Sequence, residues 1–319
     1  MDNTDKKLRI VYGDVTLGVH GKDFHYIFSY QTGGLESLVV QDKEWLYRTP
    51  KPTFWRAVTD NDRGCGFHWK SGMWLGADMF LPCKGIEVSV DGEKIELPIA
   101  PNNNRYSEQS FAQCVKLTFA YETITEPATN VFVDYSVDTV GRIHVDVRYE
   151  GKKGLPELPA FGMRFVMPTK AAGYRYEGLS GETYPDRKAG ASRGIFEVEG
   201  LPVTPYLVPQ ECGMHIDTKW VTVYRDTVLD NRQREISRTG LCFDAGEGVF
   251  GFSCLPFTAE ELENATHQEE LPPERRTVLC IMGAVRGVGG IDSWGTDVEE
   301  AYQIDAEKDI VFSFDIYHD

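Results

Sequence analysis

Apolar and polar side chains alternate along most of this 319-residue chain. Short segments rich in Val, Ile, Phe and Tyr are separated by Gly, Asp and Pro at turn spacing, a pattern typical of half-buried β-strands. Asp91-Gly92-Glu93 has the composition of a hairpin turn. The alternation predicts strands at residues 8–12, 16–19, 24–30, 35–40, 86–90, 94–97, 115–123, 131–137, 143–149, 162–167, 220–224, 241–243, 249–254, 277–282 and 310–316.

One segment carries the end signals of a helix. Thr258-Ala259-Glu260-Glu261 is a capping box with acidic residues in its first turn, and Pro272-Pro273 stops the segment. Strands this numerous, with no alternating helices and no repeat period, predict an all-β fold of antiparallel sheets packed face to face, with one or two short helices. Because no Pro- or Ser-rich linker interrupts them, we expect one domain over residues 8–319 after a disordered tail at residues 1–7.

Charge and composition narrow the possible partners. A formal net charge of −16 and a pI near 4.9 argue against nucleic acid or an anionic membrane, because a phosphate-binding surface needs clustered Lys and Arg. The first residues lack the apolar core of a signal peptide, and no apolar run approaches the roughly 20 residues that span a membrane. We therefore expect a cytoplasmic protein.

Several chemical motifs lack the context that their function requires. Gly246-Glu247-Gly248-Val249-Phe250-Gly251 spells a dinucleotide-binding motif, but it continues as a strand and not as the helix that would bind the phosphate. Asp60-Asn61-Asp62-Arg63-Gly64 is similar to a calcium loop, but its Gly comes one residue early and Ser71 stands where the closing Glu belongs. Seven scattered cysteines, with no Cys-x-x-Cys pair, are expected to be reduced core thiols and not zinc ligands or disulfides.

Side chains able to act in acid–base catalysis are not singled out by the sequence. The 49 acidic residues offer too many pairs to choose among. His144, His215 and His267 lie in or near predicted strand or helix ends, where a hydrogen-bonded structural histidine is expected. No metal site is predicted on this chain.

The segment Gly289-Gly290-Ile291-Asp292-Ser293-Trp294-Gly295 brings one tryptophan onto a glycine-rich turn. Glycine reaches backbone conformations closed to other residues, so the segment can form a fixed loop that points its aromatic side chain outward. A tryptophan beside β-structure can equally fill the core. From the residues alone both interpretations remain open.

Four segments, in order along the chain, resemble the C-terminal domain of bacterial β-galactosidases of glycoside hydrolase family two. The first is Phe54-Trp55-Arg56-Ala57 with Thr59-Asp60-Asn61-Asp62 and Gly64. The others are Glu182-Thr183-Tyr184-Pro185-Asp186-Arg187, Thr204-Pro205-Tyr206 with Pro209-Gln210-Glu211, and Gly290-Ile291-Asp292-Ser293-Trp294. Since the chain begins at its own methionine and holds only this domain, it resembles the small subunit of heterodimeric β-galactosidases, from about Leu8 onward.

The resemblance implies a large antiparallel supersandwich of the galactose-mutarotase type and a role in hydrolysing galactosides such as lactose, with transfer of galactose to acceptors. It implies that the two glutamates of the retaining mechanism, and the magnesium and sodium ions, belong to the large subunit, so that no residue here is catalytic and this chain alone is inactive. Trp294 would offer its face to the sugar leaving group or acceptor. Asp60, Asn61, Asp62, Gly64, Asp292 and Ser293 would lie on loops of the same pocket.

Two points qualify these roles. Asp60, Asn61 and Asp62 could equally form a buried turn whose side chains cap backbone amides. The sequence departs from the family at Gly178-Leu179-Ser180-Gly181, which is one residue short, and at Cys212-Gly213 and His215, where Asn-Gly and Arg are usual. The local loop path, and any contact made by that Arg, therefore do not carry over.

We expect the large subunit to cover an extensive apolar and aromatic interface, with Trp55, Phe67, Trp69 and Trp74 as candidates for that surface or for the core behind it. Two alternatives remain open. An aldose-epimerase-like enzyme would need a His acid and a carboxylate base in one cleft. A stand-alone carbohydrate-binding module would need only the sugar-binding surface.

Overall fold

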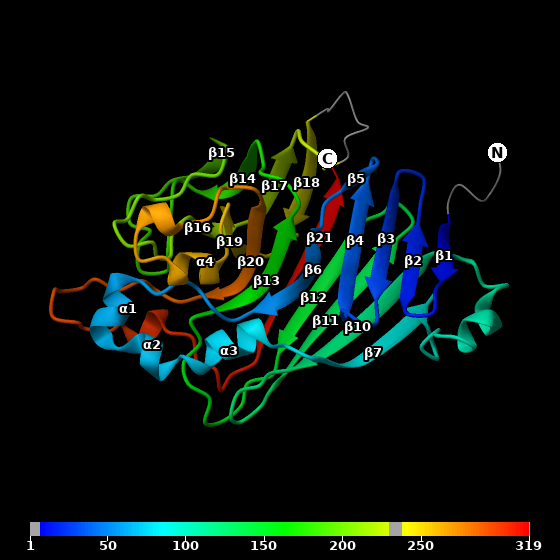
Figure 1. Ribbon diagram of the computed structural model, residues 1–319, viewed down its shortest axis with the longest axis horizontal. Helices are drawn as coiled ribbons and strands as arrows, with labels where there is room; N and C mark the ends of the chain where they lie inside the picture. Colours follow the sequence, from blue (N-terminus) through cyan, green and yellow to red (C-terminus); the bar gives the residue numbers. More distant parts are fainter. Residues whose placement is uncertain (1–6, 230–237, 319) are drawn as a thin grey trace.

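The computed structural model describes residues 7–229 and 238–318. Within these ranges every paired strand is antiparallel, and the strands form three sheets (Figure 1). The predicted all-β antiparallel fold is confirmed. The predicted disordered tail lies, apart from Lys7, outside the described residues, and the single domain over 8–319 stays a prediction.

The largest sheet has ten strands and carries the best alternation in the sequence. Along its central strands every second side chain is fully buried and the intervening ones face solvent. In order across the sheet the strands are β15 (Arg193–Glu199), β14 (Gly173–Leu179), β17 (Trp220–Arg225), β18 (Thr239–Asp244), β21 (Ile310–His318), β12 (Ile143–Tyr149), β11 (Asn130–Asp138), β10 (Cys114–Glu122), β7 (Cys83–Val90) and β8 (Glu93–Ile95).

Two smaller sheets complete the β-structure. The six-stranded sheet has the order β5 (Lys43–Glu44), β4 (Gly34–Val40), β3 (Phe24–Ser29), β2 (Thr16–His20), β1 (Leu8–Tyr12) and β9 (Phe111–Ala112). The five-stranded sheet has the order β16 (Met214–Thr218), β19 (Phe250–Leu255), β20 (Thr277–Val285), β13 (Ala160–Met167) and β6 (Arg48–Thr53).

Both smaller sheets pack on the same face of the ten-stranded sheet. Directly opposed residues on neighbouring strands share a face, and the register joins Phe119 through Val133 and Val147 to Phe312. At one end of this face Phe119 lies 6.5 Å, between ring centroids, from Phe28 of the six-stranded sheet. At the other end Phe312 lies 5.9 Å from Phe161 of the five-stranded sheet. One buried core therefore runs between the large sheet and both small ones.

The described residues contain more helix than the one or two short helices predicted. The predicted helix is present as α4 (Ala259–Asn264), and its capping box between Thr258 and Glu261 is formed. Three others follow one another along the connection between β6 and β7: α1 (Asp60–Cys65), α2 (Phe67–Lys70) and α3 (Met73–Met79). Short 3-10 turns lie at Asn102–Tyr106, Gln268–Glu270 and Glu300–Tyr302. None of these helices has the length and apolar character needed to cross a membrane.

Some local predictions need correction. The prediction missed β5, β6, β9, β14, β15 and β16; β14 runs through Leu179, so the segment that departs from the family pattern begins as strand and not as loop. No disulfide joins the seven cysteines, all of which are described, but Cys114 is exposed and is not a core thiol.

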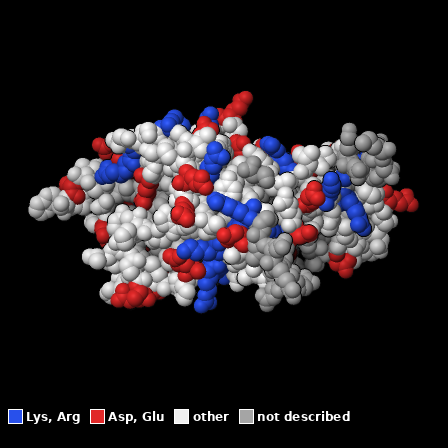
Figure 2. Space-filling view, turned by 90° about the horizontal axis from the view of Figure 1, so that it is seen from above, with Lys and Arg blue, Asp and Glu red and all other residues white. Residues whose placement is uncertain are grey.

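On the face seen in Figure 2, Lys and Arg are mixed with Asp and Glu and form no continuous basic surface there.

Candidate functional site

The tryptophan of the glycine-rich loop points into solvent. Trp294 is 92% exposed, so the interpretation of this residue as part of the core is wrong. The Asp292 carboxylate shapes the turn, because it accepts hydrogen bonds from the backbone N–H of Trp294 at 2.9 Å and from the Thr296 hydroxyl at 2.5 Å. These bonds also lower the pKa of Asp292 below its usual value. The loop thus presents an indole ring on a turn held by its own side chains.

Two charged residues of a distant motif hold the start of this loop. The Asp186 carboxylate accepts from the backbone N–H groups of Val288, at 3.0 Å, and Gly289, at 2.8 Å. The Arg187 guanidinium donates to the carbonyl of Gly289. From α1, the Asn61 side chain donates to the carbonyl of Val288 at 2.9 Å. Successive backbone groups at the root of the loop are therefore held by both neighbouring segments.

The far side of the loop rests directly on α1. Gly295 has a φ of +86°, and a Cβ built on it would lie 2.7 Å from the carbonyl oxygen of Gly64. A Cβ built on Gly64 would in turn lie 3.6 Å from the Gly295 Cα. Backbone meets backbone here, and this close approach requires glycine at position 295.

Asp60, Asn61, Asp62 and Gly64, expected on a loop, lie instead in the helix α1. Thr59 caps it: its hydroxyl accepts from the Asp62 backbone N–H at 3.1 Å, and the Asp62 carboxylate accepts from the Thr59 backbone N–H at 3.0 Å. Gly66, with a φ of +73°, ends it in the left-handed conformation. The sequence signal was Thr59-x-x-Asp62, a capping box with Asp in place of the usual Glu.

Asp62 does not line a pocket, contrary to the prediction, because it is the buried centre of an ion-pair network. Arg56 approaches its carboxylate at 2.8 Å and Arg286 at 3.1 Å. Arg286 is fully buried, bonds the carboxylates of Glu157 and Asp297, and lies 3.7 Å from the centroid of the Phe67 ring. Asp297 lies just after the Trp294 loop, so Arg286 connects the end of this loop to Asp62 of α1.

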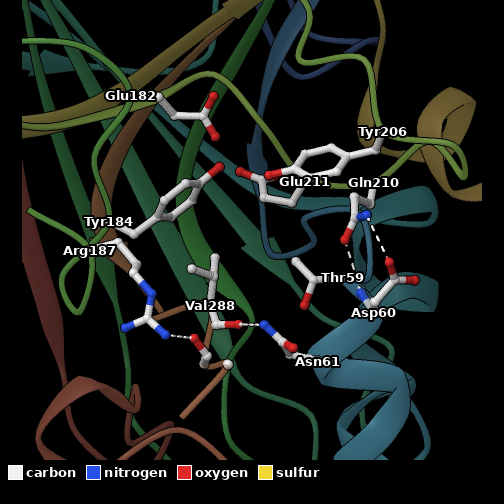
Figure 3. Close-up of a pocket in the computed structure, with 12 residues that line it drawn as sticks. Thr59, Asp60, Asn61, Glu182, Tyr184, Arg187, Tyr206, Gln210, Glu211 and Val288 are labelled. Carbon is white, nitrogen blue, oxygen red and sulfur yellow. Dashed lines mark hydrogen bonds between the residues drawn. The ribbon is translucent and has the colours of Figure 1, made fainter. Parts of the chain in front are cut away.

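The four segments that carry the family resemblance meet at one pocket of about 520 Å³ (Figure 3). Asp60 and Asn61 line it, as predicted residues of the site. Asp60 and Gln210 face each other in paired hydrogen bonds, from the Asp60 N–H to the amide oxygen at 2.9 Å and from the amide nitrogen to the carboxylate at 3.2 Å. The complete lining is Thr59, Asp60, Asn61, Glu182, Tyr184, Arg187, Tyr206, Gln210, Glu211, Val288, Gly289 and Gly290.

One end of the pocket concentrates acidic groups in a buried setting. The side chains of Glu182, Tyr184 and Glu211 point toward one another (Figure 3). Burial raises the pKa of Glu211 to about 7 against the opposing effect of the Arg56 guanidinium, and the Glu182 carboxylate raises it further. Burial likewise raises the pKa of the Tyr184 hydroxyl well above its usual value. At neutral pH Tyr184 therefore keeps its proton, and Glu211 exchanges between its protonated and ionised forms.

Several residues of the pocket were not identified from the sequence. Glu182, Tyr184, Arg187, Tyr206 and Glu211 belong to quoted motifs, but no role followed from the motifs alone. What unites them is convergence in space, which the spacing along the chain does not reveal. Conversely, Gly64, Asp292, Ser293 and Trp294 lie on the adjoining helix and loop and not in the pocket lining.

No acid–base pair of the epimerase kind is formed in this pocket. The lining residues include no histidine. His215 is buried against Tyr174, Tyr176 and Phe252, and burial lowers its pKa to about 4, as expected for a structural residue. Over the described ranges no group of three or more His, Cys, Asp or Glu residues is placed to hold a metal ion.

Comparison with known proteins identifies the family. The sequence model of the β-galactosidase small chain matches residues 20–316. The chain belongs to the β-galactosidase small-chain family. It is 63% identical over 316 residues to the β-galactosidase small subunit of Latilactobacillus sakei, covering 99% of each chain. It is 34% identical over 320 residues to a β-galactosidase of Halalkalibacterium halodurans, covering 98% of this chain and 28% of that protein.

Longer β-galactosidases thus contain an equivalent of this small-chain family member within little more than a quarter of their length. Among solved structures, a galactose mutarotase-like protein from Lactobacillus casei is similar over 95% of this chain and 100% of that chain, with 9% identity and a TM-score of 0.41. A likeness of this size gives no information about substrate or reaction. The assignment to the β-galactosidase small-chain family is based on the family model and on the two sequence relatives.

Proposed function

We propose that this chain completes a heterodimeric β-galactosidase by supplying one wall of its sugar-binding pocket. The large subunit carries the catalytic glutamates and the magnesium and sodium ions, and no residue of this chain is catalytic. The substrates are terminal β-galactosides such as lactose, and the same wall receives the acceptor when galactose is transferred. The seven cysteines form no disulfide, which suits the reducing cytoplasm that we propose as its location.

The observation that carries this proposal is the preformed Trp294 loop. The Trp294 indole is 92% exposed, so it contributes little packing within this chain. The C–H face of a sugar packs well on such an aromatic ring. The loop is anchored by Asp186, Arg187 and α1, so the ring is held in place and does not depend on a flexible tip. Trp294 therefore contacts the leaving group or acceptor and leaves the reacting galactose to the large subunit.

Truncating this ring tests the proposal. Trp294→Ala should weaken the use of lactose by the heterodimer roughly ten- to hundredfold, because it removes a stacking face and its buried area. The chemical step on galactosides with an aromatic leaving group should suffer less, since their departure needs little help from a positioned acceptor site. The melting temperature should stay unchanged, because the exposed ring has no packing to lose.

The controls use the same preparation. The purified small subunit alone should hydrolyse no galactoside, and mixing it with the large subunit should restore activity. Hydrolysis by the small subunit alone would refute the non-catalytic role. Tight binding of lactose by the small subunit alone would favour a carbohydrate-binding module instead. Equal losses on all substrates, together with a lower melting temperature, would show that Trp294 acts through stability.

A further inference from the structure

The helix α3 is apolar on both of its sides. Its inner side buries Trp74 and Ala77, and its one charged residue, Asp78, is buried as well. Met73, Gly76 and Phe80 follow at spacings of three and four residues, which places them together on the outer side. A helix that is hydrophobic all round is normally covered on all sides. On this outer side Met73 and Phe80 are exposed in the described part of the chain.

Further exposed aromatic and aliphatic side chains lie before and after α3 in the sequence. Trp69 of α2 is 83% exposed and Phe80, at the end of α3, is 61% exposed. Ile124, from the connection between β10 and β11, reaches to within 3.6 Å of the position that a Gly76 Cβ would occupy. We call these residues, Trp69, Met73, Phe80 and Ile124, the Trp69 face. Isolated exposed apolar residues are common, but exposed Trp, Met and Phe on two consecutive helices are a combination typical of a protein interface.

The Trp69 face is continuous with the Trp294 loop. Lys70, next to Trp69, pairs with Asp297 at 3.4 Å, and the Cys65 thiol lies 3.5 Å from the same carboxylate. Gly64 touches Gly295. Figure 1 shows α1, α2 and α3 in a row along one rim, with the connection after β20 looping out beside α1 and α2. A molecule that reaches Trp294 is therefore brought against α2 as well.

The longer relatives indicate which molecule this is. The chain spans only 28% of the β-galactosidase from Halalkalibacterium halodurans and 27% of that from Streptococcus thermophilus. In those proteins the equivalent segment belongs to one longer polypeptide, so the remaining sequence is the natural occupant of its exposed apolar surface. We infer that the Trp69 face is the surface on which the large subunit docks, with the Trp69 indole as its most exposed contact. This inference rests on the proposed function.

Affinity measurements on the two purified subunits test the assignment. Trp69→Ala should weaken their association about thirtyfold or more, as expected for a tryptophan at the centre of an interface, and Phe80→Ser should weaken it in the same direction. Phe111→Ala is the matched control: this aromatic is 48% exposed but lies on β9, at the edge of the six-stranded sheet, and should leave the affinity unchanged. Melting of the isolated small subunit should be the same for wild type and Trp69→Ala.

The possible results distinguish an error in the docking surface from an error in the proposed function. If wild-type subunits associate and both variants bind as tightly as wild type, the Trp69 face is not the docking surface, while the proposed function stands. If wild-type subunits do not associate at all, the proposed function itself fails. If the isolated small subunit self-associates and Trp69→Ala abolishes this, the face binds a second copy of this chain and the inference is overturned.

Discussion

Gly295→Ala perturbs the Trp294 loop at the one point where its backbone touches α1. The substitution has two costs. Alanine in the left-handed region costs about 1–2 kcal/mol. In addition, its Cβ would start 2.7 Å from the Gly64 carbonyl oxygen and must move out to about 3.4 Å, so the loop or the end of α1 shifts by about 0.7 Å. Because Trp294 is the preceding residue, this shift displaces its ring.

Gly92→Ala isolates the first cost. Gly92 has a φ of +84°, close to the +86° of Gly295, but nothing lies within 4 Å of its added Cβ. Gly92→Ala should lose about 1–2 kcal/mol in the free energy of unfolding of the small subunit, and Gly295→Ala should lose more, because it also has the clash. Only Gly295→Ala should also lower kcat/KM for lactose in the heterodimer, about tenfold or more, since sub-ångström misplacement of a positioning group is costly. If the two variants have the same stability and the same kcat/KM, the contact between Gly64 and Gly295 does not position Trp294.

Two further predictions concern buried charges. Asp62→Asn should cost about 3–5 kcal/mol in thermal or urea unfolding, because it leaves Arg56 and Arg286 buried beside a neutral amide; a cost below about 1 kcal/mol would contradict the network. Burial raises the pKa of Glu211 from 4.5 to about 7, so the folded state holds a proton that the unfolded state releases, and the contribution of Glu211 to stability falls as the pH rises through this range. Glu211→Gln should therefore gain stability relative to wild type between pH 5 and pH 8, by at most ~3 kcal/mol, and a stability difference independent of pH would refute this.

Alternation along the chain was sufficient to predict the strands that have one buried and one exposed face. The range 143–149 matches β12 at both ends, because each of its odd-numbered residues is apolar and fully buried. The alternation failed where a strand is short or has a different environment. β6 contains two prolines in Arg48–Thr53 and lies at the edge of the five-stranded sheet, where proline is tolerated but obscures the pattern. β14 has buried glycines and few polar positions, so its sequence lacks the alternation of apolar and polar residues that predicts a strand.

The helix α1 shows why local signals can be outweighed by composition. Asp60-Asn61-Asp62-Arg63-Gly64 is rich in residues that favour turns, which predicts a loop. The capping box at Thr59 and Asp62 is a local signal for the opposite, but a six-residue helix is not stable on propensity alone. What stabilises it is the pairing of Asp62 with Arg56 and Arg286, and Arg286 lies more than 220 residues away along the chain. No window of sequence contains both partners.

The residues that line the pocket are also far apart in the sequence, from Thr59 to Gly290. The family resemblance picked out four segments, and residues of all four, Asp60 and Asn61 among them, line the same pocket; their role in binding sugar stays a prediction. It could not show that Glu211 lies in a buried setting beside Tyr184 and Glu182, because burial depends on how β14, β16 and α1 are packed and not on the neighbours of Glu211 in sequence. The raised pKa of Glu211 is therefore a property of the tertiary structure alone.

The anchors of the Trp294 loop all come from the small subunit itself. Asp186 and Asn61 hold its first residues, and Arg286 binds Asp297 at its end. The loop is therefore shaped before any partner arrives. Ordering a loop during association would subtract from the affinity, so a preformed loop leaves the contact energy available for the sugar and for the large subunit. For the proposed pocket shared by two chains, a wall that already has its shape needs no ordering on association, and the ion-pair network around Asp62 provides that shape on this side.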